Sequence, residues 1–265
     1  MATWSVVATV REPIDVLRAF AAHHLLLGAE RVHLYFDDPD DPNLWLFQNE
    51  RRIIMESCDA AYWRRQGRAR PEMIQDRQDI NATGALRRCG SDWLVHTDAD
   101  EFLITRGQVD TALDQIALQE AAVHVPRCER LRPRWRASSS RYDGLFKRTA
   151  KRRWLARRLH RLAIWLAYCE DWKLLRMGFF SHIHGKVFVR TGRSEMAHGS
   201  HACLRDGSPV EPWHQRSFIL LHFFANNQDD WLRKLRFKRP RRLTNGRVRK
   251  NWGLVRLRAS ANGSI

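Results

Sequence analysis

The sequence contains no pair of cysteines spaced as CxxC, and its five cysteines are scattered and odd in number. This pattern argues against a zinc cluster and a disulfide framework, and it predicts reduced thiols in a cytoplasmic protein. A run of about eighteen or more apolar residues is also missing, so the sequence predicts no transmembrane helix. Residues 1–10 have neither a basic n-region nor a long apolar h-region, and we interpret them as a first strand rather than a signal peptide.

Acidic residues are absent from the stretch 231–265, which carries twelve Lys and Arg residues. From Arg127 to Arg161, fourteen Lys and Arg residues stand against only Glu129 and Asp143. These two stretches together exceed the net charge of +17, so the rest of the chain is acidic on balance. Such basic segments favour a polyanionic partner, which leaves anionic lipid, acidic polysaccharide and nucleic acid as candidates.

The hydrophobic residues, 44% of a chain of 265, are sufficient for the core of one large domain. The predicted elements are, in order, a strand at Trp4–Val10, a helix at Ile14–Leu27, a strand at Arg31–Phe36, a helix and a short strand within Leu44–Met55, and a helix at Glu72–Arg88. Pro13 suits the first turn of the first helix, and Gly28 suits its end. The opening β-α-β unit is typical of a parallel sheet, so the predicted fold class is α/β.

One apolar run ends in three carboxylates within four residues: Asp98, Asp100 and Glu101. Leu94 and Val95, just before them, predict a short buried strand. Residues two apart in an extended chain point to the same side, so we expect the two aspartates to face one way. Two neighbouring carboxylates repel unless a partner such as a hard divalent cation lies between them. The pattern therefore predicts a metal site at a strand end.

Polar residues also follow the other predicted strands, and ligands of open α/β sheets bind beyond the carboxyl ends of the strands. We therefore expect several of these residues to share one rim with the acids: Thr9, Arg11, Glu12, Asp37 and Asp38. The run 37–41 is also consistent with a solvated turn rich in Asp and Pro. The helix before the acidic strand carries Arg77 and Asn81, which are predicted either to face a ligand at this rim or to form an exposed helix face.

Several motifs resemble, in order, those of the family 2-like glycosyltransferases, in particular the bacterial group related to DUF23/family 92 enzymes. The resemblance begins with Val6–Glu12, the helix containing His23-His24, and the acidic turn after Tyr35-Phe36. Asp98–Phe102 is similar to the family's Asp-x-Asp-Glu-Phe motif. His184–Arg190 resembles its Gly-Lys-x-x-x-Arg strand, and 221–224 resembles its late His-Tyr segment. The matches span roughly residues 4–240, although Asp38 stands where the family has Asn and the basic segment 127–161 has no counterpart.

The resemblance implies a glycosyltransferase A fold, which is a Rossmann-like mixed sheet flanked by helices. It implies a single catalytic domain at 1–230 with a basic helical insertion at 127–170, followed by a basic C-terminal segment at 231–265. Asp98 and Asp100 are implied to bind Mn²⁺ or Mg²⁺ on the donor diphosphate. His222 is either a further metal ligand or a structural histidine, and Glu101 is either an indirect ligand or part of a surface salt bridge.

The residues implied to contact the nucleotide sugar are Thr9, Arg11, Glu12, Asp37, Asp38, Arg77, Asn81, Asp98 and Lys186. Of these, Lys186 either neutralises phosphate charge or is an ordinary surface lysine. The implied reaction transfers a sugar, expected to be UDP-linked, to a hydroxyl of a glycan or lipid-linked acceptor with inversion, as in polysaccharide biosynthesis. Inversion needs one general base. The candidates are Glu195, His198, His201, Asp206 and Glu211, among which we favour His201 or Asp206 over a polar loop without chemistry.

The stretch 151–168 mixes arginines with Trp and Leu at helical spacing. It predicts a solvated helix face, a peripheral contact with the anionic inner face of a membrane, or a site for an acidic glycan. The net charge of +17 and eleven tryptophans also support an alternative function, a nucleic-acid-binding protein or a metal-dependent nuclease. No RRM, KH, zinc-finger or helix-turn-helix signature accompanies them.

Overall fold

The computed structural model describes residues 1–131, 142, 144–148, 158–159, 161–163, 165–166, 179 and 184–223. The chain separates into two compact units, of which the first comprises residues 1–131, 142–148 and 184–224. Every helix and strand whose bounds are given below belongs to this first unit. The expected C-terminal segment at 231–265 and most of the expected insertion at 127–170 lie outside the described residues.

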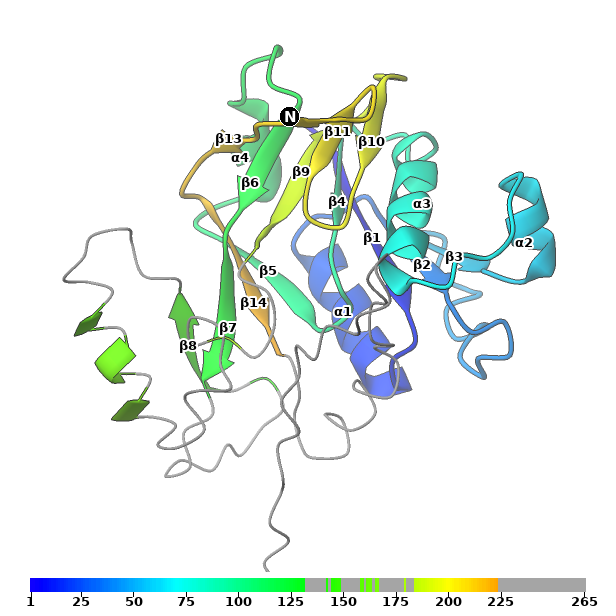
Figure 1. Ribbon diagram of the computed structural model, residues 1–265, viewed down its shortest axis with the longest axis horizontal. Helices are drawn as coiled ribbons and strands as arrows, with labels where there is room; N and C mark the ends of the chain where they lie inside the picture. Colours follow the sequence, from blue (N-terminus) through cyan, green and yellow to red (C-terminus); the bar gives the residue numbers. More distant parts are fainter. Residues whose placement is uncertain are drawn as a thin grey trace, which may run out of the picture. The chain divides into compact units, whose positions relative to one another are not determined.

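The larger sheet has seven strands in the order β13-β6-β9-β4-β1-β2-β3 (Figure 1). Their bounds are β1 Trp4–Val10, β2 Arg31–Phe36, β3 Ile53–Ser57, β4 Trp93–His96, β6 Ala122–Val125, β9 Lys186–Arg190 and β13 Trp213–His214. The four strands β1 to β4 run parallel to one another, and β9 lies antiparallel between β4 and β6. The prediction of an α/β fold with a mixed sheet is therefore confirmed, and the carboxyl ends of four strands meet at one edge.

Helices cover both faces of this sheet because strand β1 alternates apolar side chains between two cores. Val6 and Ala8 of β1 join the apolar cluster that includes α1 (Ile14–Leu26) and α4 (Val109–Asp114). Val7 points to the other face and joins the cluster that includes α2 (Ala60–Arg65) and α3 (Ile74–Leu86). Continuous apolar strands with both faces covered are typical of parallel sheets.

The second sheet has four strands in the order β5-β14-β7-β8. Their bounds are β5 Glu101–Thr105, β7 Arg127–Leu131, β8 Leu145–Arg148 and β14 Phe218–His222. A three-stranded sheet is formed by β10 Met196–His198, β11 Cys203–Arg205 and β12 Ser208–Val210. The expected helical insertion at 127–170 is thus corrected at its start, because its first residues pair with β14 as a strand.

The first three predicted elements agree with the structure to within one residue, since β1 and β2 have the expected bounds and α1 ends at Leu26. The helix expected near Leu44 is wrong. Residues 42–49 form turns, and the Asp41 side chain accepts the Asn43 N–H at 2.8 Å, which offers the backbone an alternative to helix. Among the described residues, no helix has both the length and the hydropathy needed to cross a bilayer.

Candidate active site

The acids predicted as a metal site lie in a tight turn between β4 and β5, which we call the acid turn (Asp98–Glu101). The Asp98 N–H donates to Glu101 Oε2 at 3.0 Å, and the Glu101 N–H donates to the Asp98 carbonyl at 2.9 Å. The side chain of Asp98 is about one third exposed, whereas Glu101 is fully buried. The turn therefore presents Asp98 to solvent and holds Glu101 beneath it.

Among the described residues, the partners of Asp98 and Asp100 differ, whereas an extended chain predicts that the two aspartates face one partner. Gln78 of α3 donates to Asp98 Oδ1 at 2.9 Å, and Lys186 Nζ lies 3.5 Å from the same oxygen. Asp100 Oδ2 instead lies 3.3 Å from His222 Nε2. The difference arises because residues 99–100 turn the chain toward β5, so the period-two alternation of β4 ends before the acids.

Lys186 is a buried residue at the start of β9 and not a surface lysine. Its ammonium lies 3.5 Å from Glu101 Oε2 and 3.5 Å from His96 Nδ1, in addition to Asp98. Burial alone would lower the pKa of Lys186, but the carboxylates of Asp98 and Glu101 outweigh burial and raise it. The preceding Gly185 permits this position, because a Cβ there would lie 2.2 Å from the Val125 carbonyl oxygen.

A row of charged side chains crosses the second sheet beneath the acid turn. The strand register places His222 of β14 between Glu101 of β5 and Glu129 of β7, and it places Lys147 of β8 opposite Glu129. Glu129 Oε1 lies 3.3 Å from Lys147 Nζ, and its Oε2 lies 3.2 Å from Arg127 Nη2. All five side chains are buried. We call Glu101, Arg127, Glu129, Lys147 and His222 the ion row.

Within the ion row, His222 connects Glu129 to the acid turn. Burial and the nearby Arg127 guanidinium both disfavour a charged imidazole, but Asp100 and Glu129 together outweigh them and raise the pKa of His222. Arg127 also contacts His222 Nδ1, and its Nε lies 3.7 Å from Glu101 Oε1. The structure therefore places His222 beside Asp100 of the acid turn.

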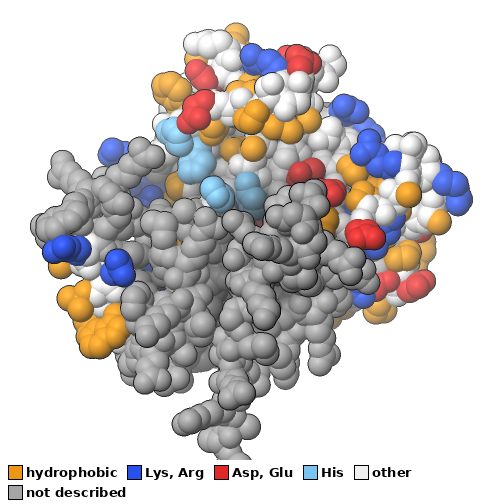
Figure 2. Space-filling view, viewed as in Figure 1, with side chains coloured by type: hydrophobic (Ala, Val, Ile, Leu, Met, Phe, Trp, Pro, Cys, Tyr) orange, Lys and Arg blue, Asp and Glu red, His pale blue; other side chains and the backbone are white. Residues whose placement is uncertain are grey.

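Figure 2 shows exposed histidine side chains together on one face of the molecule. The buried His96 and His198, together with His201, lie near Lys186. The His96 N–H donates to His198 Nε2 at 3.2 Å, and His198 Nδ1 donates to the Gly199 carbonyl at 2.8 Å. His201 Nδ1 donates to the Gly185 carbonyl at 3.2 Å. Burial, followed by the Lys186 charge, lowers the pKa of His201 to about 4, so its ring is neutral near pH 7.

Of the two favoured base candidates, the structure places only His201 beside Lys186 and the acid turn. Asp206 sits at φ 49° with Gly207 at φ 79° in the two-residue turn that joins β11 to β12. An Asp-Gly pair with positive φ angles is common in such two-residue hairpin turns. The backbone geometry of the turn therefore explains the presence of Asp206. Glu195 and Glu211 are exposed. We therefore retain His201 alone.

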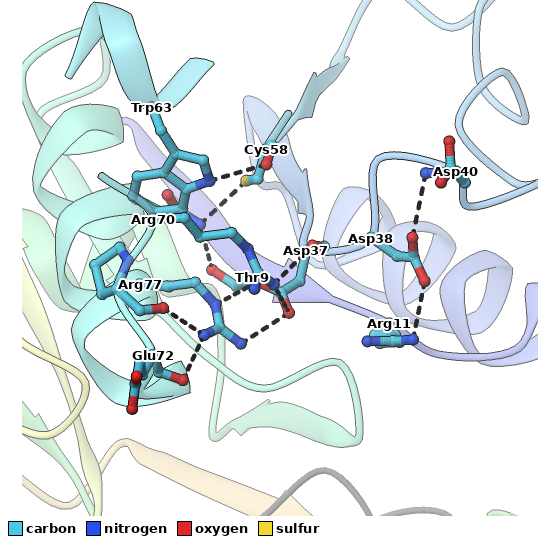
Figure 3. Close-up of polar contacts among 12 residues, drawn as sticks. Thr9, Arg11, Asp37, Asp38, Asp40, Cys58, Trp63, Arg70, Glu72 and Arg77 are labelled. Carbon is cyan, nitrogen blue, oxygen red and sulfur yellow. Dashed lines mark hydrogen bonds and ion pairs between the residues drawn. The ribbon is translucent and has the colours of Figure 1, made fainter. Parts of the chain in front are cut away.

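A pocket of about 570 Å³ lies at the carboxyl ends of β1 to β3. Figure 3 shows Asp37 at its edge, where Arg77 donates to both carboxylate oxygens at 2.6 Å and 3.0 Å. Arg70 donates to Asp37 Oδ2 at 3.0 Å, and Arg11 pairs with the adjacent Asp38 at 2.9 Å. Asp37 is thus a buried carboxylate that is paired with two arginines, and it is not a solvated turn residue.

Thr9 was expected at the ligand rim, and Asn81 was expected either there or on an exposed helix face. In the structure both take part in internal hydrogen bonds. Asn81 is fully buried, accepts the Tyr62 hydroxyl at 2.6 Å and donates to Thr9 Oγ1 at 2.9 Å. This contact fixes α3 against the end of β1. Glu12 is half-buried just beyond that strand end.

The donor chemistry of the acid turn suits Mg²⁺ or Mn²⁺, because hard cations prefer carboxylate oxygens. The geometry does not form a ready site, since no group of three or more His, Cys, Asp and Glu ligands converges within the part of the chain that the structure describes. Among the described residues, Asp98 lies beside Lys186 and Asp100 lies beside His222. The described residues thus supply oxygen donors that suit such an ion but do not by themselves enclose one, and we derive no step through it.

Several residues of this region were missed or misread at the level of sequence. Arg127, Glu129 and Lys147 belong to a stretch whose charge suggests a solvated basic segment. The available signal was Glu129, a rare acid in that stretch, in the alternating run Arg-Cys-Glu. Gln78 belongs to the polar side of the helix before the acidic strand, and the fold brings it to Asp98. Comparison of the chain with protein-family models and with curated proteins finds no match.

Proposed function

We propose that this chain is a glycosyltransferase of the glycosyltransferase A fold, which moves a sugar from a nucleoside diphosphate to a hydroxyl group of a glycan or lipid-linked acceptor. The observation that carries the proposal is the acid turn, which follows the central strand β4 at the edge where four parallel strands end. Ligands of α/β sheets bind at this edge. The ordered motifs that resemble the family 2-like enzymes support the same reaction.

The pocket beside the acid turn supports an anionic nucleotide donor. Four arginines line it, namely Arg11, Arg64, Arg68 and Arg70. Three carboxylates also line the pocket. Asp37 and Asp38 pair with arginines, and Asp59 caps α2 by accepting the Tyr62 N–H at 2.6 Å. Arginine charge at the rim therefore remains available to attract phosphate. We assign the nucleoside to this pocket and the diphosphate to the edge between the pocket and Asp98.

The neutral ring of His201 supports its assignment as general base. A carbonyl only accepts hydrogen bonds, so Nδ1 holds the proton that faces Gly185 and Nε2 is the basic nitrogen. In the proposed reaction, the bond between the sugar carbon and the phosphate oxygen breaks, and the acceptor oxygen forms the new bond to that carbon. The acceptor proton passes to His201 Nε2, and the diphosphate leaves with the bonding electron pair.

Calorimetric titration with UDP in the presence and absence of Mn²⁺ tests the proposal. We expect saturable UDP binding that Mn²⁺ strengthens, and we expect Asp100→Ala to lose it. The matched control is Asp206→Asn, which removes a carboxylate from an exposed hairpin turn and should bind as the wild type does. Equal UDP binding with and without metal, or in Asp100→Ala, contradicts the assignment of the acid turn to the diphosphate.

A panel of nucleotide sugars then identifies the donor, with slow hydrolysis of each donor in the presence of Mn²⁺ as the readout. A glycosyltransferase is expected to release nucleoside diphosphate from one donor much faster than from the others. Release from none of them, by protein that binds UDP, counts against sugar transfer as the reaction.

A further inference from the structure

The base candidate His201 lies in the connection between β10 and β11, which we call the base loop (residues 198–202). The Gly199 N–H donates to the Ala202 carbonyl at 2.9 Å and closes this loop into a tight turn. Strand β10 lies beside α3 (Figure 1). The position of the His201 ring therefore depends on the contacts that fix the base loop to α3 and to the larger sheet.

Two side chains of α3 hold the backbone of the base loop. Asp79 Oδ1 accepts the Ser200 N–H at 2.5 Å. One turn further along the helix, Thr83 Oγ1 accepts the His198 N–H at 3.1 Å and donates to the His198 carbonyl at 3.3 Å. Burial raises the pKa of Asp79, whereas the hydrogen bonds from Ser200 favour its charged form. Because Ser200 directly precedes His201, Asp79 restrains the backbone that carries the imidazole.

The ring itself meets the larger sheet at Gly185, whose carbonyl accepts the His201 Nδ1–H at 3.2 Å. Gly185 lies tightly against β6. A Cβ at this position would lie 2.2 Å from the Val125 carbonyl oxygen and 2.8 Å from His124 Nε2, and a backbone oxygen within a sheet cannot move aside easily. Glycine therefore permits the close approach that brings this carbonyl to His201.

The contact with Gly185 selects one tautomer of His201. Burial lowers the pKa of His201 to about 4, so the ring is neutral near pH 7 and carries a single proton. A carbonyl can only accept, so that proton lies on Nδ1. Free neutral histidine in water favours the other tautomer, with the proton on Nε2. The surroundings of His201 thus reverse an ordinary preference.

We propose that Asp79 and Gly185 are positioning residues, which hold His201 in the Nδ1–H tautomer by fixing its backbone from α3 and its ring from the sheet. Gln78, the neighbour of Asp79, donates to Asp98 at 2.9 Å. One turn of α3 therefore holds both the base loop and the acid turn and sets their separation. The consequence for catalysis rests on the proposed function, whereas the tautomer and its dependence on Asp79 and Gly185 do not.

Nuclear magnetic resonance of the full chain carrying ¹⁵N-labelled histidine tests the proposal, because a protonated ring nitrogen resonates far from an unprotonated one. The signals of His201 are identified by their loss in His201→Gln. At pH 7 the wild type is expected to show a protonated Nδ1 and an unprotonated Nε2. Gly185→Ala and Asp79→Ala should each shift His201 toward the Nε2–H form or toward exchange between the two forms.

The matched controls are Gly84→Ala and Asp76→Ala, which make the same chemical changes at other positions of α3. A Cβ at Gly84 would make an ordinary contact of 3.6 Å with Arg88 Nη2, and Asp76 is exposed. Both controls should keep the wild-type signals of His201. With the donor that the nucleotide-sugar panel identifies, Asp79→Ala should lower kcat by about tenfold to a hundredfold and leave the Kd of UDP within about twofold.

A wild-type His201 in the Nε2–H form, or in exchange between both forms, would overturn the proposal. A folded Gly185→Ala or Asp79→Ala protein that keeps the wild-type signals would overturn the role of the residue replaced. Circular dichroism establishes folding, and if neither variant folds, the wild-type tautomer decides the matter. A changed tautomer in Asp79→Ala with unchanged kcat contradicts His201 as the base of the proposed function, and it leaves the positioning of the ring intact.

Discussion

Replacing Glu129 with glutamine tests whether the ion row holds the second sheet together. Glu129 is fully buried, and its two oxygens lie 3.2 Å from Arg127 and 3.3 Å from Lys147. The amide of Glu129→Gln has nearly the same shape but no charge, so Lys147 loses the carboxylate opposite it. Arg127 keeps a second carboxylate, since its Nε lies 3.7 Å from Glu101 Oε1.

Removing one partner of a buried ion pair costs about 3–5 kcal/mol, because a buried charge is left uncompensated. The pair that remains between Arg127 and Glu101 places Glu129→Gln at the lower end, at about 3 kcal/mol. For a domain of this size, that loss lowers Tm by roughly 10 °C. Thermal and urea unfolding followed by circular dichroism measure both quantities.

The matched control is Glu195→Gln, which makes the same chemical change at an exposed position and should alter stability by less than about 0.5 kcal/mol. The double variant Glu129→Gln/Lys147→Met removes both members of one pair. It should be more stable than the sum of the single effects predicts by about 1–3 kcal/mol. A Tm for Glu129→Gln within about 2 °C of the Glu195→Gln control would refute a stabilising role for the row.

Three further predictions concern pH, the base and the basic segment. Burial lowers the pKa of His24 to about 3, so the unfolded state binds a proton that the folded state does not, and stability should fall as the pH drops from about 6.5 toward 3. Urea unfolding of His24→Leu at pH 7 and pH 5 should therefore give a smaller difference than wild type, and an equal difference contradicts this assignment. His201→Gln should lower kcat by about 10²–10⁴ with little change in the Kd of UDP, whereas Asp206→Asn should keep its kcat; loss of activity in Asp206→Asn alone would reverse our choice of base. The helical residues Leu159, Leu162, Trp165 and Leu166 are 50–61% exposed, so the chain should sediment with vesicles containing phosphatidylserine at low salt but not with neutral vesicles, and sedimentation that does not respond to salt argues against the membrane contact.

The parts of the fold that follow from local patterns could be predicted from the sequence. Trp4–Val10 and Arg31–Phe36 are short apolar runs bounded by clear breakers, and their bounds in the structure are the same. The helix between them begins after Pro13 and ends before Gly28, whose φ of 94° few other residues adopt. The position of Asp98 and Asp100 after a buried strand follows from the same kind of pattern.

The parts that depend on pairing between distant strands could not be predicted. Nothing in the sequence near Arg127 indicates that it lies opposite Leu220, because a strand's partner is selected by the whole sheet. The hydrogen-bond partners of Asn81 could not be predicted either. A helical pattern identifies the buried face of a helix, but it does not identify which polar groups from other elements contact that face. Tyr62 and Thr9, which hold Asn81 inside, are separated from it by 19 and 72 positions.

The central place of β14 in the second sheet has a consequence for how the protein acquires its site. During synthesis, the acid turn and Glu129 emerge well before His222. In the folded sheet His222 lies opposite Glu101 of β5 on one side and Glu129 of β7 on the other. Until β14 inserts, the edges of β5 and β7 that it will occupy have no strand between them, and the long-range contacts that bury Arg127 and Glu129 are incomplete. Such distant pairings form slowly. The electrostatic surroundings of Asp100 are therefore a late product of folding, and partially folded chains should not yet have the contact between Asp100 and His222.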